Sequence, residues 1–187
     1  MNAERDDETC EDAAAQEALY AHLDRLEIAW RHHAHASVHT VEESRALRGD
    51  LPGLHVKNMF LKEKKGGLWL VTCREDRRIR IRDLERAIGA RNTSFGKPDL
   101  LHDALGVRPG AVTPFAALND TTGRVSVVLD AALLGADLVN AHPLHNAATT
   151  ALAPADLVRF LHSTGHPPRV EDFDVLEARA RDSEAVR

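Results

Sequence analysis

A predicted β-hairpin constrains the fold of this chain more than any other feature. The segments Leu54 to Leu61 and Leu68 to Cys73 are rich in apolar residues typical of strands, and the Lys64-Lys-Gly-Gly67 sequence between them is typical of a tight turn. We therefore expect the two segments to pair as antiparallel strands.

The first strand of this hairpin carries a lysine among apolar residues. Alternation places Lys57 on the face of Met59 and Leu61, and it points Asn58 to the opposite face. A lysine that loses its water there is costly unless it lines a cavity or finds an anionic or carbonyl partner. The alternative is an edge strand whose Lys57 extends back to water.

Further strands and helices alternate along the rest of the chain. Helices are predicted over 13–28, from a capping box at Thr40 and Glu43 to Gly49, from a cap at Asp83 to Gly89, from Pro98 to Gly106 and over 154–164. Strands are predicted over 28–33, 115–118, 124–129 and 137–141. Hairpin-like connections outnumber crossover units, which predicts an α/β protein of the α+β type with a mixed, largely antiparallel central sheet and peripheral helices.

Length and composition favour a single domain. The 187 residues divide into an acidic, frayed segment (1–12), one domain (13–170) and an acidic tail (171–187). No apolar stretch is long enough to span a bilayer, and the acidic start does not resemble a signal peptide. Cys10 and Cys73 cannot form a disulfide framework, which is typical of a reducing compartment, so we expect a cytoplasmic protein without a membrane partner.

The charge distribution is uneven although the net charge is only −5. Residues 57–98 hold twelve Lys and Arg against five Asp and Glu, whereas residues 1–17 hold seven acids and one Arg. A basic middle segment can attract a polyanion, and it can equally be an ordinary solvated surface.

Motifs of common enzyme classes are missing from the sequence. His32, His33, His35 and His39 cluster near a predicted strand end, without a Cys pair or a His-Glu-x-x-His helix, so we expect structural roles and no metal. There is no nucleophile elbow, phosphate-binding loop or dinucleotide fingerprint.

Two loops could carry chemistry. Gly110-Ala-Val-Thr-Pro-Phe115 can bring backbone N–H groups close to a ligand carbonyl, or it can be a plain turn. The stretch from Asn140 to Thr150 follows a predicted strand and is rich in hydrogen-bonding side chains, where His142 is either functional or structural.

Together, three segments resemble the YbaK/ProX family, the editing domains associated with prolyl-tRNA synthetase. They are Lys57-Asn-Met-Phe-Leu61, Gly110-Ala-Val-Thr-Pro114 and Asn140-Ala-His-Pro-Leu144 with Asn146 and Thr149. The resemblance runs from about Leu19 to Gly165, and it is closest to the free-standing enzymes that hydrolyse alanyl-tRNA(Pro). It implies the YbaK fold and ester hydrolysis without metal, cofactor or covalent enzyme intermediate.

The resemblance also implies site residues and partners. Lys57 and His142 would be catalytic, and the substrate would be bound by Asn58, Gly110, Thr113, Pro114, Asn146 and Thr149. The partner would be mischarged tRNA(Pro), whose stem phosphates the basic 57–98 segment could contact, with prolyl-tRNA synthetase or an elongation factor as a transient partner and no DNA.

Three alternatives stay open. Within the family, the substrate could be cysteinyl-tRNA(Pro). Outside it, the chain could be a non-catalytic module that binds tRNA or a synthetase. The third alternative is a metal-dependent hydrolase built on the histidine cluster.

Overall fold

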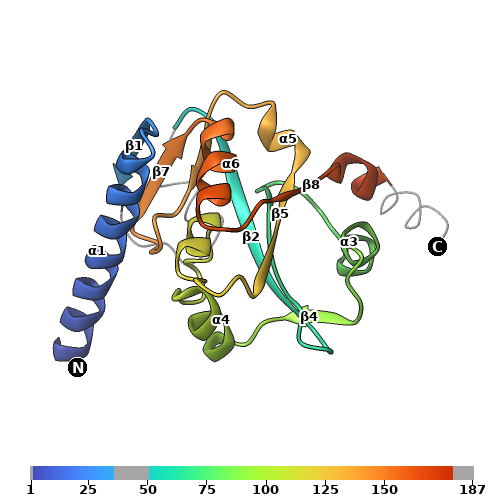
Figure 1. Cartoon of the computed structure of the whole chain (residues 1–187), viewed down its shortest axis with the longest axis horizontal. Coiled ribbons are helices and arrows are strands. Elements are labelled where there is room, and N and C mark those ends of the chain that lie inside the picture. Colours follow the sequence, from blue (N-terminus) through green and yellow to red (C-terminus); the bar gives the residue numbers. More distant parts are fainter. Residues whose placement is uncertain (1, 36–50, 179–187) are drawn as a thin grey trace.

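A single eight-stranded sheet forms the centre of the protein. The computed structural model describes residues 2–35 and 51–178, with the backbone alone for residues 2–10 (Figure 1). The strands run in the order β1-β7-β6-β2-β3-β5-β8, and β4 pairs with β2 outside this path. They are β1 (Trp30–Ala34), β2 (Leu54–Glu63), β3 (Leu68–Arg74), β4 (Thr93–Phe95), β5 (Val125–Asp130), β6 (Val139–Ala141), β7 (Ala148–Leu152) and β8 (Arg169–Glu171).

The predicted fold class is confirmed. Within the described residues, four strand pairs are antiparallel and three, β2 with β6, β3 with β5 and β5 with β8, are parallel. The predicted hairpin is β2 and β3, with Lys57 opposite Cys73. The helices are α1 (Asn2–Arg25), α3 (Ile81–Ile88), α4 (Pro98–Leu105), the 3-10 helix η1 (Pro114–Leu118), α5 (Ala131–Leu134), α6 (Pro154–Ser163) and a helical segment over 173–178.

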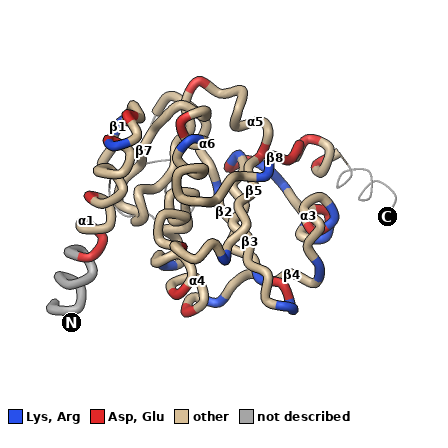
Figure 2. Tube along the Cα trace, viewed as in Figure 1, with Lys and Arg blue, Asp and Glu red and all other residues tan. Residues whose placement is uncertain are grey.

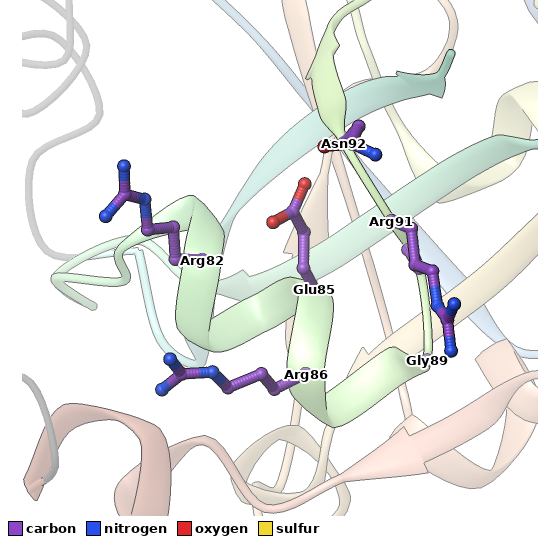
Figure 3. Close-up of a pocket in the computed structure, with 7 residues that line it drawn as sticks. Arg82, Glu85, Arg86, Gly89, Arg91 and Asn92 are labelled. Atoms are coloured by element: carbon purple, nitrogen blue, oxygen red, sulfur yellow. The ribbon is translucent and has the colours of Figure 1, made fainter. Parts of the chain in front are cut away.

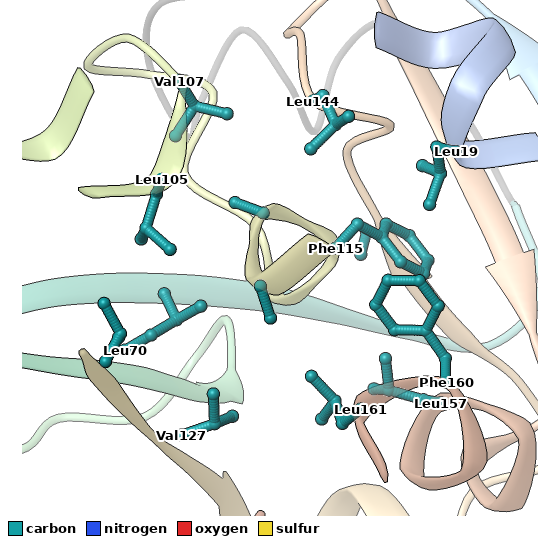
Figure 4. Packing of buried hydrophobic residues seen from close by; sticks show 14 of the residues in the cluster. Leu19, Leu70, Leu105, Val107, Phe115, Val127, Leu144, Leu157, Phe160 and Leu161 are labelled. Atoms are coloured by element: carbon teal, nitrogen blue, oxygen red, sulfur yellow. The ribbon is translucent and has the colours of Figure 1, made fainter. Parts of the chain in front are cut away.

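The larger core lies between one face of the sheet and α1, α4, η1 and α6. Phe115 of η1 meets Phe160 of α6 edge to face, with ring centroids 5.4 Å apart (Figure 4). Leu19 and Leu23 bring the apolar stripe of α1 into the same cluster. This packing holds η1, and therefore the loop that precedes it, firmly against the sheet.

A smaller core covers part of the opposite face. Leu61 and Val71 of the hairpin pack there against Leu84 of α3 and against Phe173 and Leu176 of the C-terminal helical segment. Residues 171–178, which the sequence suggested were part of an acidic tail, thus contribute to the fold. Helices cover both faces of the sheet, in line with the peripheral helices expected.

Several local predictions need correction. Residues 115–118 form part of η1 and not a strand, because Pro114 begins the turn and the Thr113 side chain accepts the Phe115 N–H. Asp83 does not cap α3: it lies inside the first turn, buried, where it pairs with Arg80. Helix α1 begins at Asn2 rather than near residue 13. The capping box at Thr40 and Glu43 lies outside the described residues.

Candidate functional site

The two polar residues of β2 point to opposite faces of the sheet, as alternation predicts. Met59 and Leu61, on the face of Lys57, belong to the smaller core, whereas Phe60 and Val56 belong to the larger one. The structure therefore places Lys57 and Asn58 in different environments.

Asn58 anchors the loop over residues 110–114. Its Nδ2 donates to the carbonyl of Val112 at 2.8 Å, and its Oδ1 accepts the Thr72 hydroxyl at 2.8 Å. Both ends of the amide are engaged within the protein. Asn58 thus holds the 110–114 loop against β2 and β3.

The 110–114 loop presents several backbone donors. Gly110 has a φ of 90°, a conformation that suits glycine, and Pro114 begins η1. Among residues 2–35 and 51–178, no acceptor pairs with the N–H groups of Gly110, Val112 and Thr113. Such a set of donors can bind a carbonyl or oxyanion, the role predicted for this loop.

Lys57 has the carbonyl partner that its position requires. Its Nζ donates to the backbone oxygen of Arg77, and the side chain is half-buried. Strand pairing shows which other residues share this face. Asn140 of β6 pairs with His55, which is two residues from Lys57. Asn140 also pairs with Ala151 of β7, which is two residues from Thr149. Lys57 therefore shares a face with Thr149.

The loop and Lys57 flank the same stretch of β2. Along one edge, β2 pairs with β6 at residues 54–55 and with β4 at residues 61–63. Among the described residues, no strand pairs with residues 56–60 along this edge, so it is open there. Val112 approaches this stretch through Asn58. The loop approaches this open edge from the Asn58 face and Lys57 lies on the other face, so a ligand that meets both must bind across the edge of β2.

Of the predicted residues in the 142–149 segment, Asn146 lies near the 110–114 loop, and His142 and Thr149 lie near His35. A Cβ added at Gly110 would lie 3.8 Å from Nδ2 of Asn146. His142 Nδ1 lies 3.0 Å from the carbonyl of Ala148, which can only accept, so Nδ1 carries a proton and donates to it. His35, whose ring lies 6.3 Å from that of His142, bonds through Nε2 to the Thr149 hydroxyl at 3.0 Å.

The histidines of the predicted cluster that the structure describes include His32 and His35, which have structural partners, whereas His39 lies outside the described residues. His32 Nδ1 lies 2.7 Å from the Tyr20 hydroxyl, and His145 bonds to Gln16 of α1 and to the backbone of Ala147. Burial is the main cause that lowers the pKa of His145. Over the described ranges, no three His, Cys, Asp or Glu side chains converge to hold a metal ion.

Asn140 is a polar residue for which sequence reasoning found no role. Its Nδ2 donates to the carbonyl of Pro52 at 3.0 Å, and its Oδ1 is buried without a partner in the structure described. An unsatisfied buried acceptor costs about 1–3 kcal/mol, so such a group points to a bound donor. The sequence feature that could have indicated this role is an asparagine between the apolar residues Val139 and Ala141 of β6.

The loop that holds Lys57 is fastened by a buried ion-pair network. Arg77 is 3% exposed, and its guanidinium bonds to Asp130 at 2.9 Å and also to Asp174 and Glu177 of the C-terminal helical segment. The Arg78 N–H donates to Glu177 at 2.8 Å. These contacts fix the 74–78 loop, and with it the carbonyl that Lys57 binds.

Asp130→Ala should therefore destabilise the protein strongly. It removes the carboxylate that faces the buried Arg77 and the cap of α5, and breaking a buried pair costs about 3–5 kcal/mol. Arg124→Ala, which breaks the exposed pair with Asp103, should cost less than about 1 kcal/mol. Urea unfolding at pH 7 measures both, and equal losses for the two variants would contradict the role of Asp130.

Cys73 is not a nucleophile at this site. Burial raises the pKa of its thiol to about 12, so the reactive thiolate is scarce at neutral pH. The site therefore offers amide, ammonium and imidazole groups for chemistry on a bound carbonyl.

Known proteins share this arrangement of segments. The family description "Aminoacyl-tRNA editing domain" matches residues 35–160, the part of the chain that holds every predicted site residue. The chain belongs to the aminoacyl-tRNA editing domain family. The resemblance drawn from the sequence is thereby confirmed.

Individual members of the editing domain family are similar over most of their length. The chain is 42% identical over 154 residues to Prolyl-tRNA synthetase associated domain-containing protein 1 of Danio rerio, covering 81% of this chain and 84% of that protein. It is 36% identical over 156 residues to Prolyl-tRNA editing protein ProX of Acetoanaerobium sticklandii, covering 83% and 95%.

A solved structure supports the same fold. The crystal structure of a proposed trans-editing enzyme for prolyl tRNA synthetase superposes on this editing domain with a TM-score of 0.65 at 22% identity, covering 84% of this chain and 95% of the other. Among the described residues, none of the helices combines the length and the apolar character that a membrane span requires.

Proposed function

We propose that this editing domain is a trans-editing deacylase that hydrolyses the ester of mischarged alanyl-tRNA(Pro) and spares prolyl-tRNA(Pro). The observation that carries the proposal is the set of N–H groups in the 110–114 loop that have no acceptor among the described residues, beside the stretch of β2 that carries Lys57. The names of the relatives, which refer to prolyl-tRNA editing and to prolyl-tRNA synthetase, support the choice of tRNA.

The reaction needs no covalent intermediate with the protein. A water molecule attacks the ester carbonyl carbon, the bond from that carbon to the ribose oxygen breaks, and the ribose oxygen takes up a proton. The loop N–H groups and the Lys57 ammonium stabilise the charge that develops on the carbonyl oxygen. We assign the orientation of the water to His142, whose ring is held by the bond from Nδ1 to the carbonyl of Ala148.

The buried acceptor of Asn140 suits the other end of the substrate. An aminoacyl ester carries a free ammonium group, and Asn140 Oδ1 is an acceptor on the same face of the sheet as Lys57. We propose that this oxygen accepts a hydrogen bond from the ammonium group.

Hydrolysis should survive removal of metal ions, because over the described ranges no three His, Cys, Asp or Glu side chains converge as metal ligands. We expect an excess of EDTA to change the initial rate of alanyl-tRNA(Pro) deacylation by less than about twofold, whereas a zinc-dependent hydrolase loses its activated water when the metal leaves. The same assay tests the proposal itself. Loss of activity with EDTA and recovery with Zn²⁺ would support the histidine cluster instead, and no hydrolysis in either buffer would favour a tRNA-binding module.

A further inference from the structure

A cleft lined by arginines lies beside α3, away from the loops described above. It has a volume of about 580 Å³ and is lined by Arg82, Glu85 and Arg86 of α3 and by the segment 89–92 that follows it. Figure 3 shows Arg82 and Arg86 extending from α3 and Arg91 from the segment that leads into β4. All three arginines are exposed, and Figure 2 shows Lys and Arg positions, in blue, at α3.

The acids near this cleft are engaged by other groups. Glu85 accepts the hydroxyl of Thr93 at 2.9 Å, and Asp83, which is 5% exposed, pairs with Arg80 at 2.7 Å and with Arg86 at 3.5 Å. Within the part of the chain that the structure describes, no ion pair engages Arg82 or Arg91. The cleft therefore keeps a positive charge available for an anion.

An exposed aromatic residue follows the cleft along the chain. Phe95 of β4 is 63% exposed, which is unusual for a large apolar side chain. It pairs with Leu61 and so stands on the Lys57 face of β2, while the backbone of Gly96 packs against Phe60 on the other face. Exposed Lys64, bonded through its N–H to the carbonyl of Asn92, adds charge beside it.

Phe95 of β4, through its partner Leu61, stands on the same face of β2 as Lys57. Leu61 is four residues from Lys57, or roughly 13 Å along β2. Leu61 itself is buried in the smaller core, so the accessible route between the two residues is the edge of β2 that no described strand pairs between residues 55 and 61. Phosphates bind arginine, and unpaired bases stack on exposed aromatic rings. An RNA whose paired end binds the arginines could therefore stack an unpaired base on Phe95 and pass along this edge to Lys57 with its 3′ end.

We propose that Arg82, Arg86, Arg91 and Phe95, which we name the α3–β4 surface, bind the acceptor end of the tRNA. The arginines contact backbone phosphates, and Phe95 stacks on one of the unpaired nucleotides at the 3′ end. This inference rests on the proposed function, since it is that reaction which requires a tRNA 3′ end at Lys57. The proposal assigns only part of the basic 57–98 segment to tRNA binding. Lys62, for example, pairs with Ser94 and points to the face opposite Phe95 and Lys57.

Binding of uncharged tRNA tests this surface separately from hydrolysis. The probes are an uncharged tRNA(Pro) transcript and the same transcript without its unpaired 3′ nucleotides, measured by fluorescence anisotropy over a series of salt concentrations. Arg82→Gln/Arg91→Gln should weaken binding of both probes about 10-fold and reduce the slope of log K against log salt by about 1.4. Phe95→Ala should weaken binding of the full transcript about 5- to 150-fold and leave the truncated one unchanged.

The matched control removes two arginines elsewhere. Arg124→Gln/Arg159→Gln changes the net charge equally. However, Arg124, which precedes β5, pairs with Asp103 of α4, and Arg159 pairs with Asp156 within α6. This control should bind both probes nearly as the unchanged protein does. Equal weakening by the two double variants, or equal effects of Phe95→Ala on both probes, would overturn the proposal.

The outcomes also separate this surface from the proposed reaction. If the predicted binding pattern appears but alanyl-tRNA(Pro) is not hydrolysed, the surface is supported and the deacylase proposal fails. If hydrolysis at subsaturating tRNA occurs and is unaffected by Arg82→Gln/Arg91→Gln, the deacylase proposal stands and the surface is overturned.

Discussion

Lys57→Met is expected to lower the kcat of alanyl-tRNA(Pro) hydrolysis about 10³-fold while the protein stays folded. Removing one preorganised donor to a developing oxyanion costs about 10²- to 10³-fold, and Lys57 also brings a positive charge to that oxygen. Methionine keeps most of the apolar stem that packs beside Met59, so the lost group is the ammonium. Single-turnover hydrolysis with saturating protein measures this rate.

Lys62→Met is the matched control, because it changes a lysine on the same strand that points to the other face. Its rate should stay within about twofold of the unchanged protein. Thermal unfolding of both variants shows whether they remain folded. A folded Lys57→Met variant with near-normal turnover would remove Lys57 from the mechanism.

Alanyl-tRNA(Pro) should be hydrolysed with a kcat/KM at least about 100-fold above that of prolyl-tRNA(Pro). Proline carries two more carbons than alanine, and overpacking a small pocket costs about 1–3 kcal/mol, or roughly 5- to 150-fold. A shift of the ester carbonyl by about 1 Å away from the loop donors costs about 100-fold more.

Seryl-tRNA(Pro) is the informative competitor for this size-exclusion mechanism. Its added hydroxyl is small, so a pocket that works by volume should reject serine only weakly, about 10-fold. Rates for the three substrates, compared at equal tRNA concentrations, give the order alanine, serine, proline. Comparable values for alanine and proline would contradict exclusion by volume.

The hairpin and the face to which each β2 side chain points could be predicted from the sequence. Side chains of a strand alternate between the two faces of the sheet, so one known pairing fixes the face of every residue. Of the outcomes expected for Lys57, which were a cavity, an anionic or carbonyl partner, or extension to water, the structure shows a carbonyl partner at Arg77. Helix ends at Gly89 and Gly106 were also predictable, since both residues have the positive φ that terminates helices.

Other elements depend on contacts that no local pattern contains. Strand β7 is buried along its whole length, so it shows no alternation, and it is defined by pairing with β1 and β6. The many acidic residues after residue 170 suggested a solvent-exposed tail, although Phe173 and Leu176 belong to the smaller core. The neighbouring acids Asp174 and Glu177 pair with Arg77, which holds this segment against the fold. The anchoring role of Asn58 likewise depends on Val112, 54 residues away.

The most direct test of the deacylase proposal is a parallel hydrolysis assay on alanyl-, cysteinyl- and prolyl-tRNA(Pro). Each substrate carries a labelled terminal nucleotide, and each is incubated with the unchanged protein, with Lys57→Met or with buffer. We predict rapid loss of the alanyl ester, slower loss of the cysteinyl ester and a prolyl ester as stable as in buffer, with Lys57→Met close to buffer throughout. Three esters that decay as in buffer would contradict the proposal, and a faster cysteinyl reaction would identify cysteinyl-tRNA(Pro) as the substrate.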